Sequence, residues 1–508
     1  MPDDTNTLKQ MVLTLLGQID DLNGQLYYLK RQLFGKKSEK LDPAQRLLFE
    51  NLYDQVKAKV DEQRQTEAEK PKVRKNANHK GRKPLPADLP RKVIEIEPTK
   101  EEKTCPVCNN EKRRIGSEVT EVLEYVPASF FVKQYVRYKY GCKECESDIS
   151  IGQLPPRAID KGIAGEGLLA HIITSKYADH NPLNRLEGIL KRHGVDINVS
   201  TMCDWVGKSA DLLEPLVKRM HKKILQSPKI NTDDTSIPIK SKKRKGSTYK
   251  GYLWAYIDDS GNVVFDFTPT RSREGPIKFL GNYSGFVQAD AYSGYDEFFR
   301  KGNATEVGCN SHARRKFEYA LDSDPVRASR MMVLWGKLYE IEGRAKKEKY
   351  NSVQLLAARQ KEAKPILAEI KTVLEEYKNR VLPKSPMGKA ITYALNQWEA
   401  LNRYVDDPIL DIDNNISERI LRMVVIGRKN YMFAGSEAGA WRAAIIYSLV
   451  ASCKLNGIDP FAYFRDVLEK VSTHPAEAID ELLPSNWKMP NSGTEDDGVV
   501  KDQIVKVA

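Results

Sequence analysis

The clearest repeat of hydrophobic positions lies near the N-terminus. Leucines recur every seven residues from position 8 onward, and another apolar residue follows each of them four positions later. This heptad pattern predicts a coiled coil, and β-branched residues at two of the a positions favour two strands. We therefore expect a dimerisation helix of the leucine-zipper type over residues 1–60, and a homodimer or higher oligomer. A single amphipathic helix packed on its own domain is the alternative, because Gly17 and Gly24 each weaken the zipper by roughly 1 kcal/mol.

A second pattern, of short strand-like runs followed by helices, begins at residue 229. The strand-like runs occupy residues 229–239, 251–258, 263–267, 285–290 and 306–310. Turn residues at 259–262 predict a hairpin between the second run and the third. Short helices are expected at residues 273–280 and 292–299, before a long helical stretch. Residues 229–456 should therefore form an α/β domain with an all-helical insertion at residues 318–408.

The helix that follows the insertion carries a carboxylate on its polar side. Its apolar stripe consists of Ile416, Ile420, Leu421, Val424 and Val425. Asp411, Asn415, Glu418 and Arg422 lie at steps of three and four on the other side. Glu418 is thus predicted to face a working surface. The spacing of Asn415 and Glu418 also matches a capping box, in which the glutamate only satisfies a backbone N–H at the helix start.

Two other acidic residues stand at the ends of strand-like runs and are candidate partners of Glu418. They are Asp233 in the first run and Asp290 at the end of the fourth. Asp234 is the rival of Asp233, since alternation along a strand sends only one of two adjacent side chains to a given face. Weaker substitutes are Asp296, Asp411 and Asp413, the last of which is also placed to cap the helix.

Residues 160–228 are predicted to be helical, with two amphipathic helices around a turn at Gly194. The apolar face of the first helix consists of Leu183, Leu186, Ile189 and Leu190. Ser200 is placed to cap the second helix, which would bury Trp205 and Val206. This outline matches a helix-turn-helix, whose second helix enters a major groove of DNA. An ordinary helical hairpin that links two domains is the alternative.

Two Cys-x-x-Cys pairs indicate a metal site within residues 84–155. The pairs are Cys105 with Cys108 and Cys142 with Cys145. Four thiolates suit a structural, tetrahedral Zn²⁺. Alternating runs at residues 119–125 and 131–140 could form a long hairpin between the pairs. One face of the second run would carry Lys133, Tyr135, Arg137 and Lys139, as a surface for a DNA backbone or simply for solvent.

The composition and charge indicate in which compartment the protein works and what kind of partner it binds. The 508 residues carry a net charge of +12, which favours a polyanionic partner. Residues 61–83 read as a basic linker suited to lie along phosphates. No apolar run of 18 residues and no signal peptide are seen, so a cytoplasmic, nucleoid-associated protein without membrane contact is expected. Cys309 and His312 are three residues apart, but two ligands do not make a metal site and a structural role is favoured.

A series of motifs resembles one bacterial protein family. The motifs are Asp233-Asp-Thr, Gln288-Ala-Asp-Ala-Tyr-Ser-Gly-Tyr295, Cys309-Asn-Ser-His-Ala-Arg-Arg-Lys-Phe317, Asp413-Asn-Asn-Ile-Ser-Glu-Arg419 and Gly427-Arg-Lys-Asn-Tyr-Met-Phe-Ala-Gly-Ser436. They are similar to the motif series of the insertion-sequence sixty-six family of bacterial transposases, over nearly the whole chain. The resemblance implies an RNase H-like catalytic core, a catalytic triad of Asp233, Asp290 and Glu418, and double-stranded DNA as substrate. Small companion proteins of the element are further expected partners.

Three carboxylates without a nucleophile of their own are typical of two-metal-ion catalysis, with Mg²⁺ or Mn²⁺. Water would free a 3′-OH at the transposon end, and that 3′-OH would attack target DNA. The basic residues expected to contact DNA are Arg314, Arg315, Arg422, Arg428, Lys429, Lys242, Lys243 and Arg244. A zinc-dependent DNA-binding regulator and a nuclease that cuts without joining are the alternatives. The chain is expected to close with a helical segment at residues 457–486 and a disordered tail at residues 487–508.

Overall fold

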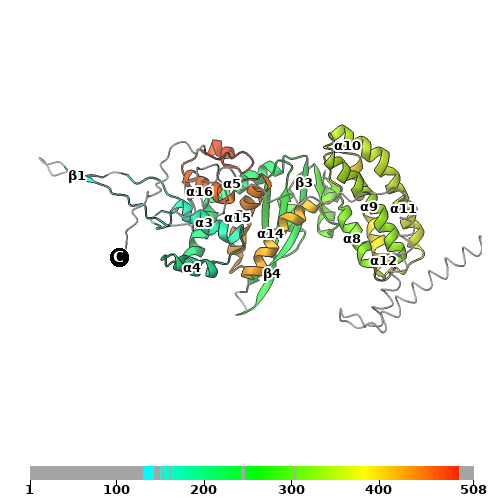
Figure 1. Cartoon of the computed structure of the whole chain (residues 1–508), viewed down its shortest axis with the longest axis horizontal. Coiled ribbons are helices and arrows are strands. Elements are labelled where there is room, and N and C mark those ends of the chain that lie inside the picture. The colour runs from blue at the N-terminus through cyan, green and yellow to red at the C-terminus, as the bar shows by residue number, and fades with distance from the viewer. Residues whose placement is uncertain are drawn as a thin grey trace, which may run out of the picture. The chain divides into compact units, whose positions relative to one another are not determined.

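The computed structural model describes residues 130–141, 149–151, 153–160, 162–241, 246–302 and 304–490 (Figure 1). Several predictions concern residues outside these ranges. They are the coiled coil of residues 1–60, the linker of residues 61–83, the four paired cysteines Cys105, Cys108, Cys142 and Cys145, the basic residues Lys242, Lys243 and Arg244, and most of the predicted tail.

The described residues form a five-stranded mixed sheet at the centre of the α/β domain. Its strands are β3 (Lys229–Lys240), β4 (Thr248–Ile257), β5 (Val263–Thr268), β6 (Phe286–Gln288) and β7 (Thr305–Val307). The order across the sheet is β5-β4-β3-β6-β7, with antiparallel pairing among the first three strands and parallel pairing of β3 with β6 and β6 with β7. The predicted strands and the hairpin at residues 259–262 are confirmed. The last strand is shorter than predicted, because Asn310 already begins a helix.

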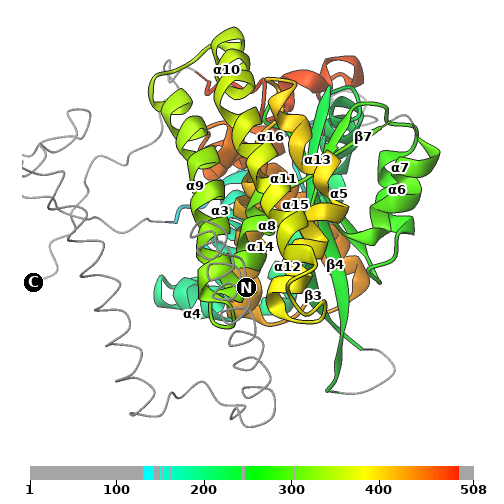
Figure 2. The ribbon, with the colours of Figure 1, turned by 90° about the vertical axis from the view of Figure 1, so that its right-hand side faces the viewer.

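Helices cover both faces of this sheet (Figure 2). On one face lie α14 (Asn415–Tyr431) and α15 (Glu437–Leu455), and on the other lie α6 (Glu274–Leu280) and α7 (Asp296–Lys301). The side chains of β4 alternate between these layers. Tyr256 stacks on Phe279 of α6 with 3.6 Å between ring centroids, whereas Ala255 and Ile257 point towards α14 and α15. Both sets are buried, which explains why β4 reads as a nearly continuous apolar run.

A helical insertion separates β7 from α14 and has its own apolar core. It comprises α8 (Asn310–Ala320), α9 (Pro325–Lys347), α10 (Ser352–Ala358), η2 (Arg359–Ala363), α11 (Lys364–Lys378), α12 (Pro386–Asn396), α13 (Trp398–Asn402) and η3 (Arg403–Val405). Phe317 and Trp335 stack at its centre with 5.1 Å between ring centroids. The buried guanidinium of Arg359 is neutralised by Glu342, at 2.8 Å, and also donates to the Tyr404 carbonyl. Fully helical sequence was predicted here and is found.

Upstream of the sheet lie α3 (Glu166–Tyr177), α4 (Leu183–Arg192) and α5 (Val199–Ile224); downstream of α15 lie α16 (Pro460–Lys470) and η4 (Ala476–Leu482). The expected turn is present, and Gly194 adopts a φ of +79° there. The predicted cap is wrong, however. Asn198 caps α5, because its side chain accepts from the Thr201 N–H at 2.9 Å, and Ser200 donates its hydroxyl to the same oxygen. α5 also packs along α15, where Arg442 binds Asp211.

The strand predicted over residues 131–140 is largely wrong. Strand β1 begins only at Lys139 (Lys139–Gly141), and it pairs with β2 (Ile149–Ile151). The other predicted run, residues 119–125, lies outside the described ranges. The preceding residues, including Phe131 and Val132, are exposed and belong to no strand. An alternating run becomes a strand only when a partner strand and a buried face are available, so sequence alternation was insufficient here.

A helix that crosses a membrane must be both long and apolar. None of the described helices meets both requirements.

Candidate active site

One aspartate lies on β3, and a second follows the neighbouring parallel strand β6. β3 pairs with β6 so that Asn231 lies opposite Gln288, and Asp233 and Asp290 each follow two residues later. Because side chains alternate along a strand, Asp233 projects to the same face as Asn231. Asp290 lies two residues beyond the end of β6, near enough for its charge to act on Asp233. Burial and, next, the negative charge of Asp290 raise the pKa of Asp233 to about 7, with smaller contributions from Asp234 and Glu418. Three carboxylates therefore act on Asp233.

Asp233 and Asp234 point to opposite faces of the sheet. In the antiparallel register, Asp233 lies opposite Ala255 and Asp234 lies opposite Trp254, and directly paired residues share a face. Trp254 contacts Tyr295 edge-on, with 6.1 Å between ring centroids, on the α6 side. Asp233 is consequently on the α14 side, which also carries Glu418.

Arg271 neutralises Asp234 on the α6 side. Its guanidinium donates to both carboxylate oxygens of Asp234, at 2.7 to 3.0 Å, and the Asp234 side chain is only 5% exposed. The guanidinium also lies 4.1 Å from the ring centroid of Tyr292. Tyr292 in turn donates its backbone N–H to Asp290, at 3.2 Å. Arg271 thus links the second aspartate of β3 to the loop that carries Asp290.

Glu418 lies in the first turn of α14 and is bound by α8. Arg315 donates to both of its carboxylate oxygens, at 2.9 and 3.1 Å. Nε2 of His312 lies 3.6 Å from Oε1 of the same carboxylate, and burial lowers the pKa of His312. The capping-box prediction is therefore wrong: Asn414 occupies the N-cap position, and Glu418 reaches towards α8 instead of back to the helix start.

A buried amide network fixes the start of α14 against the sheet. Asn414 donates to the Thr232 carbonyl at 2.8 Å and accepts from Asn231 at 3.0 Å and from Ser417 at 2.8 Å. Asn231 also donates to the Gln288 side chain, at 3.3 Å. Since Asn414 and Asn231 are almost fully buried, every lost hydrogen bond would leave an unsatisfied polar group. The network therefore fixes the position of the helix that carries Glu418 relative to Asp233 and Asp290.

Cys309 has the structural role that was predicted for it. It is buried between α8 and α14, and its sulfur accepts from the Asn414 backbone N–H at 3.2 Å. Burial raises the pKa of Cys309 to about 12, so the thiol stays protonated near neutral pH. Its neighbour His312 instead reaches the carboxylate of Glu418.

The weaker substitute carboxylates are engaged elsewhere. Asp413 accepts from the Asn415 backbone N–H at 3.1 Å and so helps to cap the start of α14. Capping was one of the two roles predicted for Asp413. Asp411 binds Lys229 at 2.8 Å. Asp296 is exposed at the start of α7.

The predicted DNA contacts divide into two groups. Arg428 binds β3, through Thr235 at 3.1 Å and Ser236 at 3.2 Å, and Arg315 binds Glu418. By contrast, Arg422 and Lys429 are exposed on α14 and pair with no carboxylate in the described part of the chain. Arg314 is half-buried on α8.

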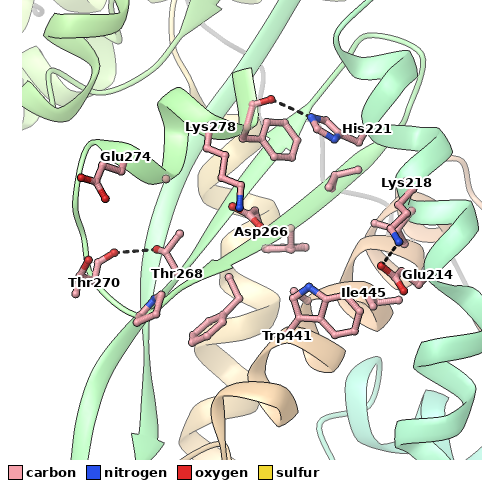
Figure 3. A pocket seen from close by; sticks show the side chains of 18 of the residues that line it. Glu214, Lys218, His221, Asp266, Thr268, Thr270, Glu274, Lys278, Trp441 and Ile445 are labelled. Atoms are coloured by element: carbon pink, nitrogen blue, oxygen red, sulfur yellow. Dashed lines mark hydrogen bonds and ion pairs between the residues drawn. The ribbon is translucent and has the colours of Figure 1, made fainter. Parts of the chain in front are cut away.

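A cavity of about 570 Å³ lies at the β5 edge of the sheet, away from the three carboxylates (Figure 3). Its charged groups largely satisfy one another. Glu214 pairs with Lys218, and Lys278 lies close to Asp266, whose pKa burial raises to about 6. The imidazole of His221 is hydrogen-bonded to the Phe279 carbonyl at 2.9 Å. Such internal pairing leaves little unmatched charge to recognise a ligand.

Comparison with known proteins gives a consistent result along the chain. The sequence model described as "Transposase IS66 family" matches residues 161–442, more than half of the chain, and includes all three carboxylates. This chain belongs to that family. The IS66 C-terminal element matches residues 448–485, the zinc-finger binding domain of transposase IS66 matches residues 102–146, and a model described as "Transposase C of IS166 homeodomain" matches residues 21–94. The motif resemblance seen in the sequence is thereby confirmed.

Full-length relatives occur in Sinorhizobium fredii strain NGR234. The uncharacterized protein y4jD is 33% identical over 97% of this chain and 98% of its own length. The uncharacterized protein y4qI is 30% identical over 96% of this chain and 98% of its own length. A third, y4hP, is 32% identical over 81% of this chain and 78% of its own length.

Sequence reasoning missed the residues that position the carboxylates. Asn414 lies inside the motif that carries Glu418, and Gln288 is the first residue of the motif around Asp290. Polar residues at positions expected to be buried could have pointed to both. Arg271 lies in the short segment between β5 and α6 and has no periodicity. Its contact with Asp234 becomes visible only in the folded chain.

Proposed function

We propose that this IS66 family transposase cleaves transposon ends and joins the freed 3′-OH to target DNA, with Asp233, Asp290 and Glu418 as its catalytic carboxylates. The observation that carries the proposal is the shared electrostatic environment of these residues. Burial raises the pKa of Asp233 to about 7, with contributions from the charges of Asp290, Asp234 and Glu418. Concentrated negative charge is costly unless a cation neutralises it, and a divalent ion would do so.

The strand order supports an RNase H-like core. Three antiparallel strands are followed by two parallel ones, with Asp233 on the central strand, Asp290 just beyond the adjacent strand β6 and Glu418 on a later helix. The helical insertion lies between the last strand and that helix. This is the arrangement that the motif resemblance led us to expect.

The donor set fits Mg²⁺ or Mn²⁺ in its chemistry, because both ions prefer carboxylate oxygens. Within the described ranges, however, no three or more His, Cys, Asp or Glu side chains are already arranged to hold a metal ion. Glu418 instead binds Arg315. We infer that Glu418 must exchange Arg315 for the metal. When bound, two such ions would stabilise the attacking and leaving oxygens of an in-line phosphoryl displacement.

The protein's own residues would prepare the site for this reaction. The Asn414 network fixes the helix that carries Glu418, and the Arg271–Asp234 pair keeps the second aspartate of β3 away from the site. Arg315, once released by Glu418, would be free to bind a DNA phosphate, for which a guanidinium is well suited.

Other parts of the chain would bind and assemble the DNA complex. We propose that Cys105, Cys108, Cys142 and Cys145 hold a structural Zn²⁺, in agreement with the zinc-finger family match over residues 102–146. The α4–α5 pair would read the transposon end as a helix-turn-helix, and residues 1–60 would form the dimer. Double-stranded DNA is the substrate, with companion proteins of the element as further partners.

Purified protein with Mg²⁺, a duplex from the DNA that flanks the gene and a supercoiled target tests the proposal. We expect the native chain to produce joined products and Glu418→Gln to produce none, with binding to the duplex retained. Glu399→Gln is the matched control, because Glu399 is 92% exposed on α13 and should leave joining unchanged.

Equal joining by the native protein and Glu418→Gln would contradict the assignment of the third carboxylate. Cleavage without joining by the native protein would favour a nuclease. Binding without either reaction would favour the DNA-binding regulator.

A further inference from the structure

We propose that Met432 and Phe433, the apolar pair at the end of α14, insert between two base pairs of the bound duplex, about six base pairs from the scissile phosphate. This inference rests on the proposed function, because it takes Glu418 as the marker of the scissile phosphate. The pair would bind the opened base step, and this contact is separate from the catalytic carboxylates.

Met432 has a backbone conformation that glycine would adopt more readily. Its φ is +62° and its ψ is −46°, directly after the last helical residue Tyr431. These angles are close to those of a classic γ-turn, and the Phe433 N–H donates to the Tyr431 carbonyl at 2.7 Å across it. This turn is rare and strained for a residue with a Cβ. Met432 recovers nothing by burial, because it is 66% exposed. Strain that persists without a benefit inside the protein indicates a function outside it.

Backbone hydrogen bonds on both sides hold the pair rigidly. The Met432 N–H donates to the Arg428 carbonyl at 2.8 Å, and the Ala434 N–H donates to the Pro238 carbonyl at 2.8 Å. The Lys240 N–H in turn donates to the Ala434 carbonyl at 2.9 Å. Phe433, between these anchors, is 39% exposed. The pair is therefore a fixed projection from α14 and β3, as a wedge must be to separate stacked bases.

One stripe of α14 connects this projection to Glu418. Arg422 and Lys429 follow Glu418 at spacings close to whole helical turns, so these three lie along one side of α14, and Met432 and Phe433 come directly after the helix ends at Tyr431. Arg422 and Lys429 are exposed. The helical rise places Met432 about 21 Å along the axis from Glu418. At 3.4 Å for each base pair, a duplex that follows the stripe reaches Met432 after about six base pairs.

The charges around the pair fit DNA better than a second copy of this chain. Lys429 and Lys240 are exposed on either side of the apolar projection. Cations beside an apolar wedge match the phosphates that flank an opened base step. In a symmetric contact with a second copy, each patch would meet itself, and the lysines would face lysines.

Fluorescence of 2-aminopurine reports the unstacking directly. The full chain would carry Glu418→Gln to prevent cleavage, and the flanking-DNA duplex would carry the probe at one position at a time. We expect binding to increase the fluorescence at the step about six base pairs from the cleavage position and not at its neighbours.

Two variants separate a wedge from a structural role. Met432→Gly removes the side chain and relieves the backbone strain, so the protein should be at least as resistant to urea as its parent, yet the fluorescence increase should be reduced or lost. Phe433→Ser should have the same effect on fluorescence. Val333→Ser is the control, because Val333 is 59% exposed on α9 and should leave the signal unchanged.

An unchanged signal in both Met432→Gly and Phe433→Ser would overturn the inference. So would a loss of self-association in these variants while the signal persists, since the pair would then be a protein interface. The proposed function fails differently: joining by Glu418→Gln at the native rate would reject the third carboxylate, and with it the distance of about six base pairs. A fluorescence increase at one base step that is lost in Met432→Gly would still support the wedge.

Discussion

Asp233 and Asp234 are adjacent on one strand, but the two faces of the sheet give them different chemistry. Asp233 faces α14, where burial raises its pKa to about 7, with contributions from the negative charges of Asp290, Asp234 and Glu418. Asp234 faces the α6 side, where Arg271 binds both of its oxygens. One carboxylate therefore lacks a cation and the other has one. The difference shows that the charged partner on each face of the sheet, and not burial alone, decides which aspartate keeps an unpaired carboxylate.

The largest expected effect comes from removing a carboxylate on the α14 side. Asp290→Asn should lower joining on the order of 10³-fold, because metal-based charge stabilisation is worth several kcal/mol and each 1.4 kcal/mol is tenfold in rate. Binding to the flanking-DNA duplex should persist. Asp296→Asn is the matched control, since Asp296 is exposed on α7. Equal losses in a gel assay of joined products would show that the α14 face is not special.

A substitution on the α6 side should lower the stability of the fold more than it lowers the rate of joining. Arg271→Gln leaves Asp234, whose side chain is 5% exposed, without its cation. We expect a loss of about 1–3 kcal/mol in the free energy of unfolding, discounted for the partial exposure of Arg271. Urea denaturation measures this loss.

A double-mutant cycle checks the cause of that loss. Adding Asp234→Asn to Arg271→Gln should recover part of the stability, because the unpaired carboxylate is gone. Additive losses would mean that Arg271 acts through its contact with Tyr292 instead.

The fold of the catalytic region was largely predictable from sequence. Strands β4 and β5 alternate or run apolar between clear turn residues, and the insertion has helical periodicity throughout. Two cap positions were not predictable. Asn198 and Asn414 stand one or two residues before the predicted caps, and the choice between them depends on where the preceding loop is anchored.

The partners of the charged residues could not be predicted. Arg315 lies more than 100 residues before Glu418, and a guanidinium in a basic motif gave no reason to choose a carboxylate over a phosphate. Arg271 lies outside every motif. Long-range pairing of this kind is a property of the packed helices and strands, whereas sequence periodicity reports only which face of each element is apolar.

The raised pKa of Asp233 predicts how stability depends on pH without added Mg²⁺. Its folded pKa of about 7 exceeds the ordinary value near 4. Between these values the folded protein binds a proton that the unfolded chain does not, so the contribution of Asp233 favours folding at low pH and is lost as pH rises through about 7. We expect the difference in urea midpoint between the native chain and Asp233→Asn to change over this range. A difference that is independent of pH would contradict the shift.

The smallest expected effect concerns the exposed cations of α14. Lys429→Ala should weaken DNA binding about equally for all sequences and lower the slope of log affinity against log salt by about 1. Fluorescence anisotropy at several salt concentrations measures this slope. Arg428→Ala should instead destabilise the fold, because Arg428 binds Thr235 and Ser236 of β3. An unchanged slope in Lys429→Ala would remove Lys429 from the DNA path.

The joining assay with Asp233→Asn and Asp234→Asn in parallel tests the central claim most directly. We predict that Asp233→Asn abolishes joining, whereas Asp234→Asn retains it with a loss of about 10–100-fold, as expected for a residue that positions others. Both proteins should still bind the duplex. Full loss in Asp234→Asn together with joining by Asp233→Asn would contradict the assignment of the two faces.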